Sequence, residues 1–128
     1  MNQDTTKIKA ALIGFGRMGQ MYGEVMAKSN RWEVAYVCDP SSASRAKAKE
    51  IFPNAQTITD ENIIFNDDSI RAVALCALAD SRKEQIEKAV RTHKHIIAEK
   101  PVADTIEHEW EVVDLVKDSG VFATVNLY

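Results

Sequence analysis

Three closely set glycines, Gly14, Gly16 and Gly19, are the first residues whose spacing points to chemistry. They follow an apolar run and open a segment with helical spacing, in the pattern G-x-G-x-x-G. Between a strand and a helix, this pattern permits a tight turn, close approach of a pyrophosphate to the backbone, and close packing of helix on strand. Phosphates would then lie against free N–H groups at the positive end of the helix. The glycines predict either a dinucleotide site or a tight turn without a ligand.

An acidic residue at a suitable distance favours the dinucleotide site. Asp39 lies about twenty residues after Gly19, at the end of the next apolar run, where a carboxylate can accept hydrogen bonds from adenosine ribose hydroxyls. It would repel a phosphate on that ribose, so NAD is favoured over NADP. Arg45, in the helix that follows, would soften this preference if it reached the ribose; otherwise it is a solvated charge. The alternative for Asp39 is a plain turn that caps a helix.

A second group of candidate reactive residues is Glu99, Lys100 and Pro101, directly after the apolar run 95–98. Open α/β sheets hold their ligands at the carboxyl ends of their strands. A lysine there could donate to a substrate hydroxyl or carbonyl and help move a proton while hydride passes to or from nicotinamide. The alternative is a solvated strand end before a turn. The peptide bond before Pro101 is open to either isomer, cis or trans.

The elements that must position these residues alternate between strands and helices. Strands are expected at residues 9–14, 32–39, 55–59, 71–78, 95–99 and 121–128, helices at 18–29, 42–52, 81–93 and 105–119, and a loop or single helical turn at 61–65. Several strands are nearly unbroken apolar runs, which is typical of a parallel sheet covered on both faces. We therefore expect an α/β fold of the Rossmann type, doubly wound, with a mainly parallel sheet and helices on both faces.

Three of the helices carry apolar stripes that we expect to cover this sheet. The stripes consist of Met18, Met21, Tyr22, Val25 and Met26; of Ile86, Ala89 and Val90; and of Ile106, Trp110, Val113 and Val116.

Length and composition place limits on the class of protein. A chain of 128 residues suits one domain, and a net charge of -3 gives no reason to expect nucleic acid or a membrane as a partner. The apolar run 72–79 is too short to span a bilayer, and residues 1–9 lack the apolar region of a signal peptide, so we expect a cytoplasmic protein. Cys38 and Cys76 are expected to be buried, reduced thiols. The three histidines lack metal-ligand spacing, and no metal is predicted.

The motifs "GFGRMG" and "AEKPVA", with Asp39 between them, resemble the glucose-fructose oxidoreductase, inositol dehydrogenase and rhizopine catabolism protein family of nicotinamide-dependent oxidoreductases. The resemblance covers essentially the whole chain. It implies that residues 1–128 are a dinucleotide-binding Rossmann domain, and that the family's larger substrate domain, which often builds the oligomer, is absent. It also implies that Lys100 is a catalytic or substrate-orienting group beside the nicotinamide, whose pocket Glu99 helps to shape.

The candidate cofactor contacts are Gly14, Phe15, Gly16, Arg17, Met18, Gly19, Asp39, Arg45, Ala77, Glu99, Lys100 and Pro101. The chain departs from the family after its fourth strand. The family often has a Thr-Pro pair there, followed by an asparagine and a histidine, whereas this sequence has Ala77 and Leu78, and Arg82 falls near the histidine position. The adenine and nicotinamide contacts on that side should therefore differ from the family's.

The resulting hypothesis is the NAD-binding part of a two-domain oxidoreductase that transfers hydride between nicotinamide and a sugar, cyclitol or related polyol. The second domain would supply specificity, a proton acceptor and any homo-oligomer contacts, so the chain alone should bind cofactor and turn over little. A free-standing module that senses NAD or another adenine nucleotide is the first alternative. The resemblance suggests a second, because some members of the family use bound NAD for glycoside hydrolysis.

Overall fold

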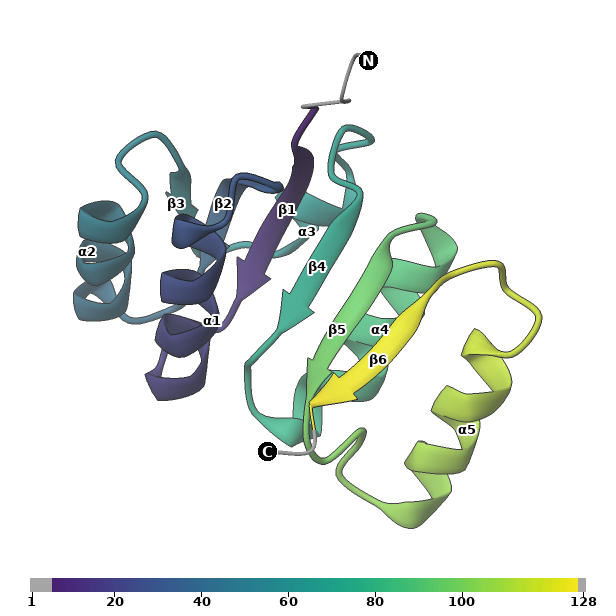
Figure 1. Ribbon diagram of the computed structural model, residues 1–128. Helices are drawn as coiled ribbons and strands as arrows, with labels where there is room; N and C mark the ends of the chain where they lie inside the picture. Colours follow the sequence, from purple (N-terminus) through teal and green to yellow (C-terminus); the bar gives the residue numbers. More distant parts are fainter. Residues whose placement is uncertain (1–5, 127–128) are drawn as a thin grey trace.

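Residues 6–126 are described by a computed structural model, in which six parallel strands form one sheet. The strands are β1 (Ile8–Ile13), β2 (Trp32–Cys38), β3 (Gln56–Ile58), β4 (Ala72–Leu75), β5 (His95–Glu99) and β6 (Ala123–Asn126). Their order is β3-β2-β1-β4-β5-β6 (Figure 1). From β1 the chain adds β2 and β3 on one side; it then crosses to the other side of β1 and adds β4, β5 and β6 there. The predicted doubly wound Rossmann fold is confirmed, while residues 127 and 128 of the expected last strand lie outside the described residues.

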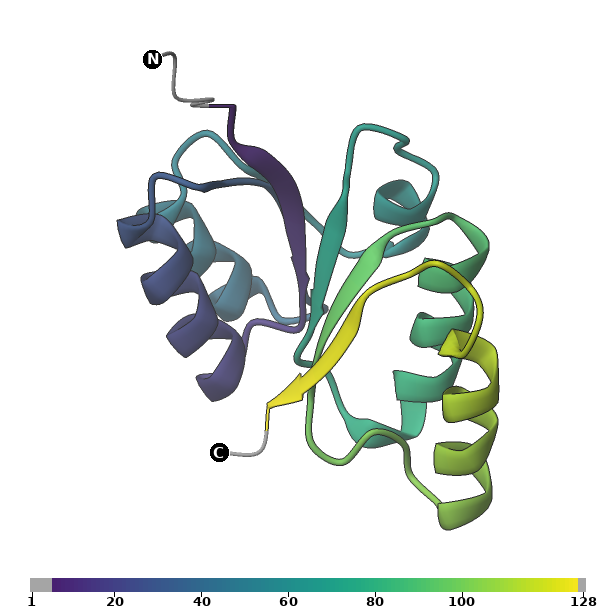
Figure 2. The same ribbon diagram turned by 45° about the vertical axis from the view of Figure 1, so that its right-hand side comes forward.

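Helices cover both faces of this sheet. They are α1 (Arg17–Lys28), α2 (Ser42–Ile51), α3 (Asn62–Phe65), α4 (Arg82–Arg91) and α5 (Ile106–Val116), with a short 3₁₀ turn at Ala79–Ser81. Figure 2 shows α1 and α2 on one side of the sheet and α3, α4 and α5 on the other. Each parallel connection therefore returns the chain through a helix to the same end of the sheet. None of the helices within residues 6–126 is long and apolar enough to cross a membrane.

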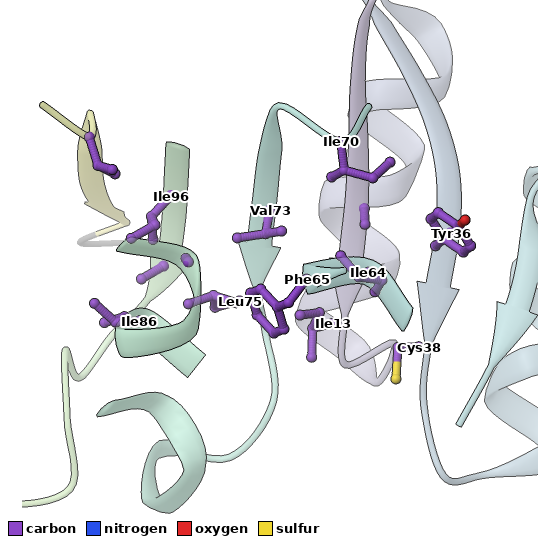
Figure 3. Packing of buried hydrophobic residues seen from close by; sticks show 14 of the residues in the cluster. Ile13, Tyr36, Cys38, Ile64, Phe65, Ile70, Val73, Leu75, Ile86 and Ile96 are labelled. Atoms are coloured by element: carbon purple, nitrogen blue, oxygen red, sulfur yellow. The ribbon is translucent and has the colours of Figure 1, made fainter. Parts of the chain in front are cut away.

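The core has two layers, one on each face. Successive residues of β1 point to opposite faces: Leu12 packs with Phe15 and Phe52 under α1 and α2, while Ile13 belongs to the other layer. Figure 3 shows this second layer, in which Leu75 and other strand residues meet side chains of α3 and α4. The layers hold the strands in place, and with them the loops at their carboxyl ends.

The apolar stripe predicted for α1 is wrong at two positions. Met21 and Val25 are exposed, and the buried residues of this helix are Gly19, Gly23 and Met26. These three are spaced i, i+4 and i+7, so they form a helical row of their own. The helix approaches the sheet so closely that its contact row is made mainly of glycine, which an apolar pattern does not register.

The stripe predicted for α5 is wrong at three of its four positions and right at Val116, whereas that of α4 is confirmed because all three of its members are buried or half-buried. Ile106 and Trp110 are 69% and 67% exposed, and Val113 is exposed as well. Val112 is the buried residue of α5, and Val116 packs against the core beside it. The helix carries two apolar rows, and periodicity alone does not say which one faces the sheet.

Candidate functional site

The carboxyl ends of the strands bring the predicted residues to one edge of the sheet. The glycines follow β1, Asp39 follows β2, Ala77 follows β4, and Glu99 ends β5. The strand arrowheads in Figure 1 mark this edge, at the bottom of the view. The order of strands reverses between β1 and β4, so their loops leave toward opposite faces there. A ligand of an open α/β sheet binds at such a switch point.

Two of the glycines are required by close packing of backbone. Gly14 has a φ of +91°, and a Cβ on it would lie 2.5 Å from the backbone nitrogen of Ala77. A Cβ on Gly19 would overlap the carbonyl oxygen of Gly14. Any larger residue would push the helix away from the turn or the turn away from the loop after β4. Gly14 and Gly19 thus have the steric roles that the sequence predicts.

Gly16 differs, because a Cβ on it would meet no atom within 4 Å. It is the N-cap of α1, without a side-chain capping bond. The first intrahelical bond there runs from the N–H of Gln20 to the carbonyl of Gly16, so the N–H groups of Arg17, Met18 and Gly19 precede the hydrogen-bonded ladder and are oriented to bind an anion. The open space and these donors fit a pyrophosphate. The side chain of Arg17 is exposed, and that of Met18 is half-buried.

Asp39 links the end of β2 to the glycine loop. One carboxylate oxygen, Oδ2, accepts a hydrogen bond from the N–H of Phe15 at 2.7 Å, and Oδ1 accepts one from the N–H of Ser41 at 2.8 Å. A carboxylate offers about four acceptor positions, so capacity remains for ribose hydroxyls. The side chain of Phe15 is fully buried in the core, which leaves only its backbone to contact a cofactor.

Arg45 packs against the same strand end. Its Nη1 donates to the carbonyl oxygens of Asp39 and Pro40, both at 2.9 Å, and the side chain is half-buried. Of the two alternatives from the sequence, a ribose contact or a solvated charge, the structure favours a third role in which the guanidinium caps the end of β2. It nevertheless places a cation beside Asp39.

A cavity of about 450 Å³ opens between the ends of β1, β2 and β4. Gly16, Asp39 and Ala77 line it, so the predicted phosphate and ribose contacts face a common space. A larger hollow of about 620 Å³ lies at the other end of the strands, near their amino ends, where Lys7 and Trp32 line it. That hollow is remote from the glycine loop and from every motif that the sequence singles out. The smaller cavity is therefore the candidate site.

Both cysteines line this cavity as free thiols. Cys38 is buried as predicted, and Cys76 is half-buried. Burial raises the pKa of Cys38 to about 11 and that of Cys76 to about 12. Neither side chain is a thiolate at neutral pH, so neither is a strong nucleophile. No cluster of three metal-ligating side chains occurs within residues 6–126.

Glu99 is held by two neighbours that the sequence did not point out. The residue is only 8% exposed, and its Oε2 accepts hydrogen bonds from the Tyr22 hydroxyl at 2.7 Å and from Nδ2 of Asn126 at 3.1 Å. Burial, together with the hydrogen bond to Glu99, raises the pKa of Tyr22, which keeps the phenol protonated as a donor. The Glu99 side chain is thus directed toward α1 and β6. The apolar spacing of the helix predicts only core packing for Tyr22.

Lys100 is exposed at this edge, directly after β5. The Lys100–Pro101 peptide bond is cis, a point that the sequence had left open. The structure thus brings the E-K-P segment, Glu99–Pro101, to the carboxyl ends of the strands, where the glycine loop also lies.

Arg82 lies behind the site and supports its loops, whereas the sequence marks it only as a departure from the family pattern. It begins α4, is 1% exposed, and donates to the carbonyl oxygens of Glu99, of Pro101 at 2.6 Å and of Ala77 at 2.5 Å. Burial lowers its pKa, but a guanidinium stays charged in proteins. A signal was present, since Arg82 lies four residues before Ile86, on the buried row of α4.

Comparison with known proteins places this geometry in a family. Residues 8–127 match GFO_IDH_MocA, described as "Oxidoreductase family, NAD-binding Rossmann fold". The uncharacterized oxidoreductase YhhX of Escherichia coli (strain K12) is 28% identical over 119 residues, which cover 91% of this chain and 34% of that protein. The inositol 2-dehydrogenase of Arthrobacter sp. (strain FB24) is 28% identical over 117 residues, covering 91% and 35%. The chain therefore spans about a third of the length of these curated relatives.

Solved structures share the fold. The scyllo-inositol dehydrogenase of Lactobacillus casei, crystallised with NAD(H) and scyllo-inositol, matches with a TM-score of 0.85 at 21% identity, over 94% of this chain and 36% of that one. GenD2 from gentamicin A biosynthesis, in complex with NAD, matches with a TM-score of 0.87 at 19% identity, over 98% and 36%.

Proposed function

The chain belongs to the oxidoreductase family with an NAD-binding Rossmann fold, and on this premise we propose that residues 1–128 are the cofactor domain of an enzyme that transfers hydride between nicotinamide and a polyol. One observation carries the proposal: open space beside Gly16, at the uncapped start of α1, faces the same cavity as the Asp39 carboxylate. Phosphate and ribose of one dinucleotide need that juxtaposition.

Each part of the edge then has a role toward the cofactor. The N–H groups at the start of α1 bind the pyrophosphate, and Asp39 accepts hydrogen bonds from the ribose, which favours NAD over NADP. The segment Glu99–Pro101 borders the nicotinamide, which supplies or accepts the hydride when bound. Lys100, exposed at that border, donates to the substrate oxygen and orients it.

The substrate class follows from the relatives. Inositol 2-dehydrogenase and a related enzyme for D-chiro-inositol are among the proteins that the chain matches. This favours an oxidoreductase that acts on a cyclitol or another polyol over a nucleotide-sensing module or a glycoside hydrolase. Specificity and the proton acceptor are assigned to a second domain. Self-association through that domain and a cytoplasmic location stay predictions, which light scattering and cell fractionation of the whole protein test.

Calorimetric titration of the chain with NADH and NADPH tests the cofactor site, with Gly16→Ala as the site variant. The added methyl group meets no protein atom, so the free energy of unfolding should change by less than about 1 kcal/mol. It occupies the space assigned to the pyrophosphate, so NADH should bind about tenfold more weakly or worse.

Gly23→Ala is the matched control in the same helix. Its methyl group would meet the rings of Phe15 and Phe52 in the core, not the cavity. Overpacking costs about 1–3 kcal/mol and alanine returns about 1 kcal/mol through helix propensity, so this variant should lose up to about 2 kcal/mol of stability and keep its NADH affinity. The proposal fails if the unsubstituted chain binds neither cofactor at millimolar concentration, or if Gly16→Ala binds NADH as tightly as the unsubstituted chain.

A further inference from the structure

The guanidinium of Arg82 joins three segments that meet at the carboxyl edge. Its Nη1 donates to the carbonyl oxygens of Glu99 and Pro101, and its Nη2 donates to that of Ala77. The first two carbonyls belong to the residues on either side of Lys100, and the third belongs to the loop after β4, which lines the cavity. One rigid, planar group thus holds the peptides around Lys100 and ties them to the cofactor cavity.

Burying this cation costs more free energy than filling the same space in the core with an apolar side chain. Arg82 is 1% exposed, it donates to three main-chain carbonyls, and Nε has no hydrogen-bond partner among residues 6–126. Burial of a cation is costly unless its hydrogen bonds are complete. An apolar side chain would fill the space without that cost but would release the carbonyls. The feature that only the guanidinium provides is the fixed relation of these carbonyls to one another.

We propose that Arg82 is a positioning residue, which fixes the segment that carries Lys100 against the loop after β4 and so forms the nicotinamide end of the cofactor site. This inference rests on the proposed function and deepens it. Arg82 is buried and does not line the cavity, so we assign it no direct contact with cofactor or substrate. It acts through the backbone on both sides of Lys100 and through the loop after β4, so its loss should weaken binding of the nicotinamide half more than binding of the half held by Gly16 and Asp39.

The chain contains a matched control for a buried cation. Lys94, directly before β5, is also 1% exposed, and its Nζ donates to the carbonyl oxygens of Asp67 at 2.7 Å and Ile70 at 3.1 Å. These contacts lie at the amino edge of the sheet, at the opposite end of β5 from Arg82. Like Arg82, Lys94 is a buried cation that binds the segments next to β4 and β5. Lys94→Met therefore removes such a cation and leaves the candidate site at the carboxyl ends of these strands unchanged.

The test compares the dissociation constants of two ligands, NADH and ADP-ribose, and follows their ratio. ADP-ribose lacks nicotinamide, so the ratio reports on the nicotinamide half alone. Both are measured by calorimetry on the unsubstituted chain and on Arg82→Met, Arg82→Lys and Lys94→Met. We expect the unsubstituted chain to bind NADH more tightly than ADP-ribose. Arg82→Met should weaken NADH about tenfold and ADP-ribose less than about threefold. Arg82→Lys keeps the charge and can reach only some of the carbonyls, so its loss should be intermediate. Lys94→Met should leave the ratio unchanged.

Three results would overturn the inference. They are an unchanged NADH affinity in Arg82→Met, an equal loss for both ligands, and a shift of the ratio by Lys94→Met as large as that by Arg82→Met. If Arg82→Met melts below the titration temperature, Arg82→Lys carries the same comparison. Failure of the unsubstituted chain to bind either ligand would overturn the proposed function itself, and this inference with it.

Discussion

Substitution of Asp39 should affect both stability and the choice of cofactor, and two variants separate these effects. The carboxylate accepts hydrogen bonds from the N–H of Phe15, which is partly buried in the glycine loop, and from the exposed N–H of Ser41. Asp39→Ala removes both acceptors. Asp39→Asn removes the charge and keeps one acceptor oxygen, which can serve the N–H of Phe15.

The expected loss of stability follows from the buried donor. A buried N–H left without an acceptor costs about 1–3 kcal/mol, whereas water replaces the bond to the exposed Ser41. Asp39→Ala should therefore lose about 1–3 kcal/mol, and Asp39→Asn less than about 1 kcal/mol. For a domain of this size, each kcal/mol lowers the melting temperature by about 3–5 °C. Thermal unfolding followed by circular dichroism measures the difference between the variants.

The expected change in cofactor preference follows from the charge. At a separation of about 5 Å and an effective dielectric of 20, a carboxylate repels a unit charge on the 2′-phosphate of NADPH by about 3 kcal/mol. Screening at physiological salt reduces this to about 2 kcal/mol, or about 30-fold in affinity. NADH should also lose about tenfold through its ribose bonds. Titration of Asp39→Asn with both cofactors should thus show the preference for NADH reduced by about 30-fold or more.

Two results would refute this reasoning. If Asp39→Asn keeps the preference of the unsubstituted chain for NADH over NADPH, the carboxylate does not face the ribose. If Asp39→Ala is as stable as the unsubstituted chain, the bond to the N–H of Phe15 does not support the glycine loop.

Three further predictions concern the fold. Gly19→Ala should lose more than about 3 kcal/mol, because its methyl group would overlap backbone; urea unfolding measures the loss. Burial and the bond to Glu99 raise the pKa of Tyr22, so the folded chain holds this proton more tightly than the unfolded chain, and stability should fall above about pH 10; Tyr22→Phe should flatten that decline in urea midpoints. The hydrogen bonds led by that from Ser69 lower the pKa of Asp67 to about 2, so stability should fall from about pH 4 downward, and Asp67→Asn should show a shallower acid limb.

The sequence predicts most of the fold because its signals are local. Alternating apolar runs and helical spacings identify the six strands and the longer helices of the sheet, and glycine marks the positions where backbone meets backbone, at Gly14 and Gly19. The same signals fail where a helix offers more than one candidate row. Trp110 is exposed and Val112 buried because tertiary packing chooses between rows that apolar spacing alone leaves equivalent.

The residues that hold the E-K-P segment were missed for a related reason. Tyr22 carries an apolar ring, so the hydrophobic pattern counts it as core, although its hydroxyl reaches Glu99 across the sheet edge. The partner lies 77 positions away, and no local spacing connects the two. Such a contact becomes visible only when the strand order is known.

Arg82 shows why one kind of site residue is harder to predict than another. A glycine required by close packing is recognisable, because every other residue type is excluded by its Cβ. The acceptors of Arg82 are main-chain carbonyls, which every residue type supplies, so Ala77, Glu99 and Pro101 carry no sign of the contact in their side chains. The sign lies in Arg82 itself, a charge on the buried row of α4 four residues before Ile86. A charged residue on an otherwise apolar helical row at the carboxyl edge of a parallel sheet therefore predicts a bond to the loops that hold the ligand.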